Sequence, residues 1–256
     1  MSYAVVMPYR GSSTRTSRVV ELCVSAWLEM PLVSSVILVD SSNTPLSFDN
    51  EKIDVIHRPY SGKFNLAFMR NVGLRHAIDS GIEHVQIMDT DIFPSSDLYS
   101  KKCLGLMTLC DMVKPYVLNS PSEVPDRMSF KDKQYQGFLN VDLDKCKRKV
   151  FSYSTIFMKT KIAAVLHGHD EAYETWGSED DDFMIRAQRA GFKVRQLPKP
   201  ELIHSWHEED TKIEAKNNTD QYDKNYKRFK LTMAGKLPQI RMPEDWGLCS
   251  QPRTGQ

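Results

Sequence analysis

The sequence lacks the features that would assign it to several large classes of protein. Its five cysteines are scattered without a CxxC pair, and an odd, unpatterned count indicates reduced thiols rather than a disulfide framework. Its 34 basic and 33 acidic residues nearly cancel, so no global field points to nucleic acid or a membrane surface, although a local basic groove stays open. No run reaches the ~18 apolar residues of a membrane span. The N-terminus has no charged segment followed by an apolar one, so we expect a cytoplasmic protein.

Two sequence motifs of common enzyme classes are also missing. There is no GxxxxGK[ST] phosphate loop and no HExxH zinc-protease string, which excludes P-loop ATPases and that protease type. The composition itself is ordinary for a soluble globular protein, with 41% hydrophobic and 26% charged residues over 256 positions. That length allows one large domain or two small ones.

Apolar runs alternate with helical patterns through the first ninety residues. Residues 19–30 and 66–79 have apolar side chains at helical spacing. Short apolar runs typical of buried strands cover Tyr3–Pro8, Ser35–Asp40, Ile53–His57 and the segment that ends at Asp89. This alternation predicts an α/β fold with a mainly parallel, doubly wound sheet. Ligands of such sheets bind beyond the carboxyl ends of the strands, where Asp40 and Asp89 lie.

The later part of the chain is less regular. Residues 97–150 mix charge with Pro and Gly, strand character returns at 151–159, and a helix is expected over 180–190 before two short strands at 193–197 and 201–206. We expect a domain over 1–208, with a nucleotide-binding half at 1–96 and an acceptor or catalytic half at 97–208. Residues 209–256 read as a charged C-terminal extension that wraps the domain, forms a lid or is partly disordered.

The string Asp89-Thr90-Asp91 follows the apolar strand directly. Two carboxylates this close stay ionised together only beside positive charge, and a hard divalent cation such as Mg²⁺ or Mn²⁺ supplies it. A turn or helix cap would explain an isolated string of this kind equally well. Its place at the ligand edge of the sheet favours the metal interpretation.

Four consecutive acids follow a Trp-Gly pair in Thr175-Trp-Gly-Ser-Glu-Asp-Asp-Asp-Phe183. The positive end of a helix dipole explains one or two acids there, but not four. A carboxylate at a helix start beside an aromatic wall is suited to act as a general base.

Two further groups carry charge or metal-binding chemistry. Ile203-His-Ser-Trp-His-Glu208 places His204 and His207 after a strand, and a site with two acids and one imidazole suits Mn²⁺ better than zinc. Lys63, Arg70 and Arg75 precede the Asp89 strand. These cations either form a solvated helix face or neutralise a diphosphate together with the metal.

The order of these pieces resembles that of GT-A-fold glycosyltransferases that use a nucleotide sugar. The strings "PYR", "RNVGLRHA", "MDTD", "WGSEDDDF" and the late histidines are similar to those of an inverting, family-2-like type, in particular β-1,4-galactosyltransferases and bacterial chondroitin polymerase domains. The resemblance covers residues 3–208. Ser178 stands where that family has the second glycine of the Gly-Gly pair in "GWGGED", which we expect to change the loop only locally.

The resemblance implies a role for each matching residue. On the donor side, Pro8, Tyr9 and Arg10 would border the nucleotide, Asp40 would contact the base or ribose, and Arg70, with Lys63, would lie near the nucleotide sugar. Asp89 would bind the ribose or a metal-bound water, and Asp91 the metal. His207 matches the late metal ligand better than His204, although both stay open. On the acceptor side, Trp176 and Gly177 would wall the sugars, Glu179 would hold a sugar hydroxyl and Asp180 would be the base.

The implied activity is metal-dependent, inverting transfer of a hexose or N-acetylhexosamine from a UDP-sugar to an acceptor hydroxyl. The acceptor expected first is a glycan. A protein, a lipid-linked sugar or a hydroxymethylated DNA base are alternatives, and the near-neutral charge disfavours DNA. A nucleotidyltransferase would carry a Gly-rich phosphate loop, whereas "YRGSSTRTSR" holds one glycine. A non-catalytic sugar-binding module would not need the acids, the histidines and the base candidate together.

Overall fold

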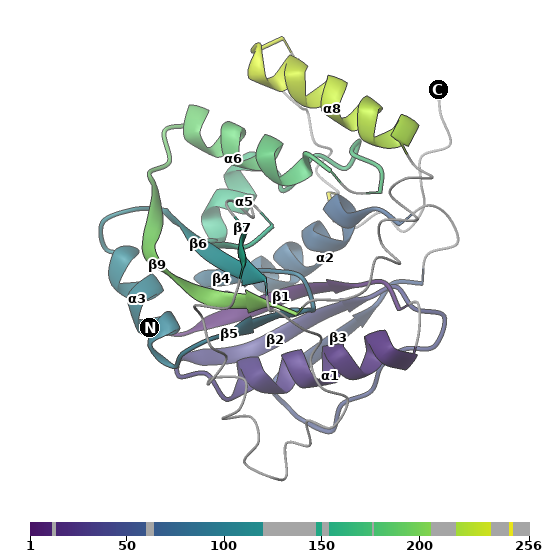
Figure 1. Ribbon diagram of the computed structural model, residues 1–256, viewed down its shortest axis with the longest axis vertical. Coiled ribbons are helices and arrows are strands. Elements are labelled where there is room, and N and C mark those ends of the chain that lie inside the picture. Colours follow the sequence, from purple (N-terminus) through teal and green to yellow (C-terminus); the bar gives the residue numbers. More distant parts are fainter. Residues whose placement is uncertain are drawn as a thin grey trace.

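A computed structural model describes residues 1–11, 14–59, 64–119, 147–149, 154–175, 177–205, 219–236 and 246–247. Within these residues one sheet runs in the order β3-β2-β1-β4-β8-β6-β9-β5, with β7 paired to β6 (Figure 1). The strands are β1 (Tyr3–Tyr9), β2 (Val33–Asp40), β3 (Ile53–His57), β4 (His84–Ile87), β5 (Ile92–Pro94), β6 (Met112–Asn119), β7 (Lys147–Lys149), β8 (Ile156–Lys159) and β9 (Val194–His204). The helices are α1 (Thr14–Leu28), α2 (Leu66–Asp79), α3 (Leu98–Leu106), α5 (Thr160–Leu166), α6 (Glu179–Arg189) and α8 (Thr219–Met233).

The first half of the sheet is parallel, as the sequence predicts. Strands β3, β2, β1 and β4 all pair in parallel. Beyond β4 the sheet becomes mixed, because β8 is antiparallel to both β4 and β6, whereas β9 is parallel to β6 and antiparallel to β5. The two short strands expected at 193–197 and 201–206 form one long strand, β9.

Alternation along β1 divides the interior into two cores. Successive side chains of a strand point to opposite faces of its sheet. Tyr3, Val5 and Met7 therefore pack with α1 and α3, whereas Ala4 and Val6 pack with α2, α5 and α6. Figure 1 shows the two sets of helices on opposite sides of the sheet.

Helix α2 lies unusually close to β1. An added Cβ at Gly73 would come within 2.4 Å of Val6 Cγ1, so only glycine allows this approach. Arg70 lies three residues before Gly73 in the same helix. The close approach of α2 therefore brings Arg70 to the carboxyl end of the parallel strands.

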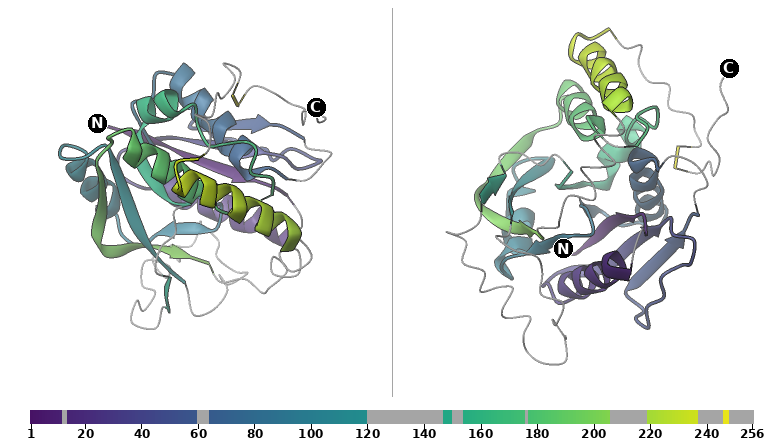
Figure 2. Two further views of the ribbon diagram at one scale, coloured as in Figure 1. Left: turned by 90° about the horizontal axis from the view of Figure 1, so that it is seen from above. Right: turned by 45° about the vertical axis from the view of Figure 1, so that its right-hand side comes forward.

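The C-terminal extension contains a well-defined helix. α8 packs on α6, with Thr232 Oγ1 donating to Asp182 Oδ1 at 2.6 Å and Arg189 donating to the carbonyl of Met233 at 2.8 Å (Figure 2). Farther on, Trp246 is buried in the core cluster of α2, and the N–H of Gly247 donates to Glu171. Within the described residues, no helix is both long and apolar enough to cross a membrane.

Candidate active site

The pair Asp89 and Asp91 lies just past the end of β4, at the carboxyl edge of the parallel strands. Met88 still bonds to the carbonyl of Val6 on β1, and both acids follow it. Their side chains face different partners. Arg70 Nη2 donates to Asp89 Oδ1 at 3.1 Å, and His204 Nε2 lies 3.1 Å from Asp91 Oδ2. Asp89 thus faces a permanent cation, which favours its ionised form, whereas Asp91 faces an imidazole.

Strand pairing explains why His204 reaches Asp91. Ile92 of β5 pairs with His204 of β9, and the N–H of Ser205 donates to the carbonyl of Asp91 at 2.8 Å. Of the two histidines that the sequence leaves open, His204 is therefore placed beside Asp91. His207 lies outside the described residues, as do Lys63 and Trp176.

Arg70 joins the two acidic motifs. Its guanidinium is fully buried and contacts Asp89, Glu179 Oε1 at 3.0 Å, and Asp180 Oδ1. Desolvation alone would lower the pKa of an arginine, but the three carboxylates outweigh it and raise the pKa of Arg70. This side chain ties the end of β4 to the start of α6, and its expected place near the nucleotide sugar stays a prediction.

Asp180 sits at the first turn of α6, mostly shielded from solvent. Burial raises its pKa well above the ordinary value for an aspartate; Arg70 opposes this shift, and the neighbouring carboxylates of Glu179 and Asp89 add to it. A carboxylate with a raised pKa is a stronger base than an exposed one.

Glu179 shapes the loop before α6. It is buried, and its second oxygen, Oε2, accepts from the N–H of Gly177 at 2.6 Å. Gly177 has φ +113, and two non-glycine residues flank it in the left-handed region, Thr175 with φ 60 and Ser178 with φ 70. Such backbone is strained for L-residues and clusters at functional loops. The glycine that the resembling family has at position 178 would relieve part of that strain.

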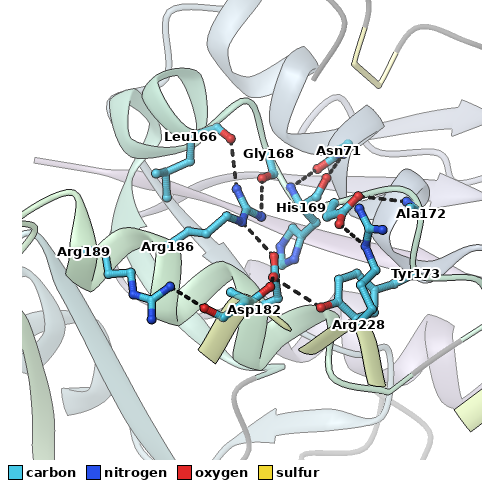
Figure 3. A network of polar contacts seen from close by, with 12 residues as sticks. Asn71, Leu166, Gly168, His169, Ala172, Tyr173, Asp182, Arg186, Arg189 and Arg228 are labelled. Atoms are coloured by element: carbon cyan, nitrogen blue, oxygen red, sulfur yellow. Dashed lines mark hydrogen bonds and ion pairs between the residues drawn. The ribbon is translucent and has the colours of Figure 1, made fainter. Parts of the chain in front are cut away.

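Asp182, the fourth acid of this string, serves the structure. It is fully buried and accepts from Tyr173, Thr232 and Arg186. The guanidinium of Arg186 also donates to the carbonyls of Leu166 and Gly168 (Figure 3). This network fixes the rotation of α6 and therefore the direction of the Asp180 carboxylate.

Sequence reasoning missed Asn71 and His169. Asn71, next to Arg70, donates to the carbonyl of His169 at 2.8 Å and accepts from the N–H of His169 at 2.7 Å (Figure 3). Its Nδ2 also donates to Glu171 Oε1. His169 is fully buried and stacks on Phe183 with ring centroids 4.4 Å apart, and within the part of the chain that the structure describes neither ring nitrogen has a hydrogen-bond partner. The asparagine stood in the quoted "RNVG" string, but a single Asn carries no signal for such a role.

The residues expected to border the nucleotide lie at the same edge of the sheet. Pro8 and Tyr9 end β1, the Tyr9 hydroxyl bonds to Ser17, and Arg10 stacks over Phe64 at 5.8 Å. Asp40 is fully buried, and its two oxygens accept from the N–H groups of Ser42 and Leu46, both at 2.8 Å. Asp40 thus shapes the loop after β2, and its expected contact with a base or ribose stays a prediction.

A protein-family comparison matches part of this site. The family described as N-terminal domain of galactosyltransferase matches residues 139–208, which include the acidic string of α6 and His204. No curated protein matches the chain by sequence.

Solved structures share the fold. A GalNAc-T7 structure with UDP, GalNAc and Mn²⁺ is similar with a TM-score of 0.57 and 10% identity over 80% of this chain and 44% of that one. S. aureus TarS 1–349 is similar with a TM-score of 0.58 and 15% identity over 93% of this chain and 67% of that one. The catalytic domain of Drosophila β1,4-galactosyltransferase 7 in complex with xylobiose has a TM-score of 0.46 and 14% identity, over 80% of this chain and 71% of that one.

These findings confirm the predicted fold class. The chain has the GT-A fold of glycosyltransferases, and its residues 139–208 match the galactosyltransferase family model. It spans less than half of the GalNAc-T7 chain that it resembles.

Replacing Arg70 by glutamine is expected to destabilise the protein by ~3–5 kcal/mol, because removing one partner leaves buried carboxylates uncompensated. Urea unfolding followed by circular dichroism measures this loss. Arg75→Gln is the matched control, since its partly exposed ion pair with Asp79 and its cation–π contact with Trp246 together are worth ~2 kcal/mol or less. Equal losses of stability for the two variants would contradict the role of Arg70 as the cation that holds these carboxylates.

His169 predicts a specific pH dependence of stability. Burial lowers its pKa well below 6.5, and the charges of Arg70 and Arg186 lower it further. Below the unfolded-state pKa of ~6.5 the unfolded chain binds a proton that the folded chain does not. The free energy of unfolding therefore decreases as the pH is lowered, by up to ~1.4 kcal/mol per pH unit. Unfolding between pH 7 and 5.5 should show a shallower slope for His169→Gln than for wild type, and identical slopes would refute the assignment.

Proposed function

We propose that the chain transfers a sugar from a UDP-sugar to an acceptor hydroxyl, with a divalent metal and with inversion at the anomeric carbon. The observation that carries this proposal is the arrangement around Arg70. A potential metal-binding pair, Asp91 and His204, and a buried carboxylate with a raised pKa, Asp180, are connected through Asp89 and Arg70 at one edge of the sheet. The GalNAc-T7 structure of the same fold contains UDP and Mn²⁺, which supports the choice of donor and metal.

The donor set of Asp91 and His204 fits Mn²⁺ or Mg²⁺. Adjacent ligands of an octahedral ion with bonds of ~2.1 Å are about 3 Å apart, close to the 3.1 Å between Asp91 Oδ2 and His204 Nε2. Carboxylate oxygen with imidazole nitrogen suits a borderline ion such as Mn²⁺. The described residues gather no set of three metal-binding side chains. The diphosphate, and His207 as the sequence predicts, would complete the ligand set.

When bound, the metal supplies Lewis-acid neutralisation of the diphosphate charge. Residues of the chain itself then take the proton from the acceptor hydroxyl. Arg70 binds Oδ1 of Asp180, so Oδ2 is the oxygen assigned to take the proton of the acceptor hydroxyl. The acceptor oxygen forms a bond to the anomeric carbon, the bond from that carbon to the diphosphate oxygen breaks, and UDP leaves with the electron pair. Attack from the side opposite the leaving group gives inversion.

The first test is metal-dependent binding of UDP, measured by calorimetry with Mn²⁺ and with EDTA. Asp91→Asn and His204→Gln should each weaken UDP binding about 10-fold or more in the presence of Mn²⁺, because each removes a metal ligand. Asp79→Asn, the same chemical change on an exposed side chain at the end of α2, should bind as wild type. UDP binding that is indifferent to EDTA would overturn the metal role.

The second test concerns the base. Asp180→Asn should lower kcat by ~10²–10⁴ and retain UDP binding, since the amide keeps the size and loses the basicity. Hydrolysis of UDP-glucose, UDP-galactose and their N-acetylamino analogues, with water as acceptor, measures turnover without knowledge of the natural acceptor. In wild type the rate should fall as pH drops through the raised pKa of Asp180, because the protonated acid accepts no proton. A near wild-type rate for Asp180→Asn, or retention of configuration by NMR, rules the assignment out.

A further inference from the structure

Helix α8 is fixed against the loop that carries the proposed active site. Asn225 Nδ2 donates to the carbonyl of Glu174 at 2.8 Å, and Arg228 Nε donates to Asp170 at 2.6 Å. Figure 1 and Figure 2 show α8 lying along α6 at the outer side of the domain. Because the buried side of α8 is held by polar contacts at both ends, the direction of its remaining side chains is set.

The tyrosine at the start of α8 lies on the active-site loop. An added Cβ at Gly177 would meet the Tyr222 ring at 2.9 and 3.1 Å, so the ring rests directly on the glycine backbone. Gly177 in turn donates to Glu179, the neighbour of Asp180. A residue of the C-terminal extension therefore forms part of the surroundings of the proposed base.

Tyr222 is the first member of a stripe along α8. Residues four apart share one face of a helix, so Tyr222, Tyr226 and Lys230 form a ridge about 12 Å long. We call these three residues the α8 ridge. Tyr222 and Tyr226 are 46% and 43% exposed, and Lys230 Nζ lies 4.5 Å from the centre of the Tyr226 ring. Half-exposed aromatic rings beside an active-site loop offer flat apolar faces on which a ligand can stack.

The charge of α8 indicates the kind of ligand. The helix carries four basic residues against two acidic ones, whereas the whole chain is almost neutral. One acidic residue of the domain, Asp170, already pairs with Arg228, and Lys230 stands at the far end of the ridge. The ridge thus offers flat rings near the loop and positive charge one to two turns away.

Building on the proposed transfer reaction, we propose that the α8 ridge binds the acceptor, and that the acceptor is an anionic glycan. Sugar rings of the acceptor stack on Tyr222 and Tyr226, whose rigid side chains lose little entropy on binding. A carboxylate or phosphate group of the chain faces Lys230. Contacts of this kind, remote from the reacting hydroxyl, hold that hydroxyl towards Asp180. The near-neutral net charge disfavours nucleic acid, whose binding depends on many phosphate contacts, and this favours a glycan.

The test is binding of the full chain to an array of defined neutral and acidic oligosaccharides, with oligo(dT) as a separate probe. The account predicts binding to chains that carry carboxylate or phosphate groups, weakened by added salt. Tyr226→Ala and Lys230→Ala should each weaken that binding about 3- to 10-fold. Tyr226 is preferred over Tyr222 because Tyr222 also packs on Gly177.

Two controls match these changes. Leu231→Ala alters an equally exposed side chain elsewhere on the circumference of α8, and Lys101→Ala removes a surface charge on α3; both should bind as wild type. UDP binding with Mn²⁺ should stay unchanged in all four variants. If the wild-type chain itself does not bind UDP with Mn²⁺, the proposed transfer reaction is refuted rather than the proposal for the α8 ridge. Binding only to neutral glycans, tighter binding to oligo(dT), no glycan binding at all, or unaltered binding by Tyr226→Ala would each overturn the ridge proposal.

Discussion

The buried guanidinium of Arg70 is the interaction on which the arrangement of the site depends. It holds one carboxylate from the end of β4 and two from the start of α6, which are about a hundred residues apart in the chain. Without a cation between them, three carboxylates at this depth would repel one another and would have to take up protons. Arg70 thereby keeps the start of α6 and the end of β4 at a fixed separation.

Several layers of packing place Arg70 there. Gly73 brings α2 against β1, and Asn71 ties the same helix to the backbone of His169. On the other side, Asp182 fixes α6 through Tyr173, Arg186 and Thr232 of α8. The C-terminal helix α8, which lies in the charged extension, is therefore part of the support of α6.

The parts of the fold that sequence predicts are those with a strong periodic signal. The bounds of β3 and α2 match the expectation because apolar residues there follow the strand and helix periods cleanly. β6 was missed because it contains Lys114 and Pro115, and the register shift beside Pro115 shows how the strand accommodates a residue without an N–H. α8 was missed because the side it buries is polar, with Gln221, Asn225 and Thr232, so no apolar stripe marks it.

For the site, the location of the acids at the sheet edge followed from strand pattern and topology. Their partners did not, because the pairing of Arg70 with α6, and of His204 with Asp91, arises from tertiary contacts that no local spacing encodes. The same holds for Tyr222 on Gly177.

The central claim, that one edge of the sheet unites a metal-binding pair and a base through Arg70, is tested most directly by a crystal structure with UDP and Mn²⁺. The account predicts an anomalous manganese peak within bonding distance of Asp91 and His204, the diphosphate beside it, and Arg70 still in contact with Asp180. A manganese peak away from both residues, or UDP bound elsewhere than at the carboxyl ends of β1, β2 and β4, would contradict it.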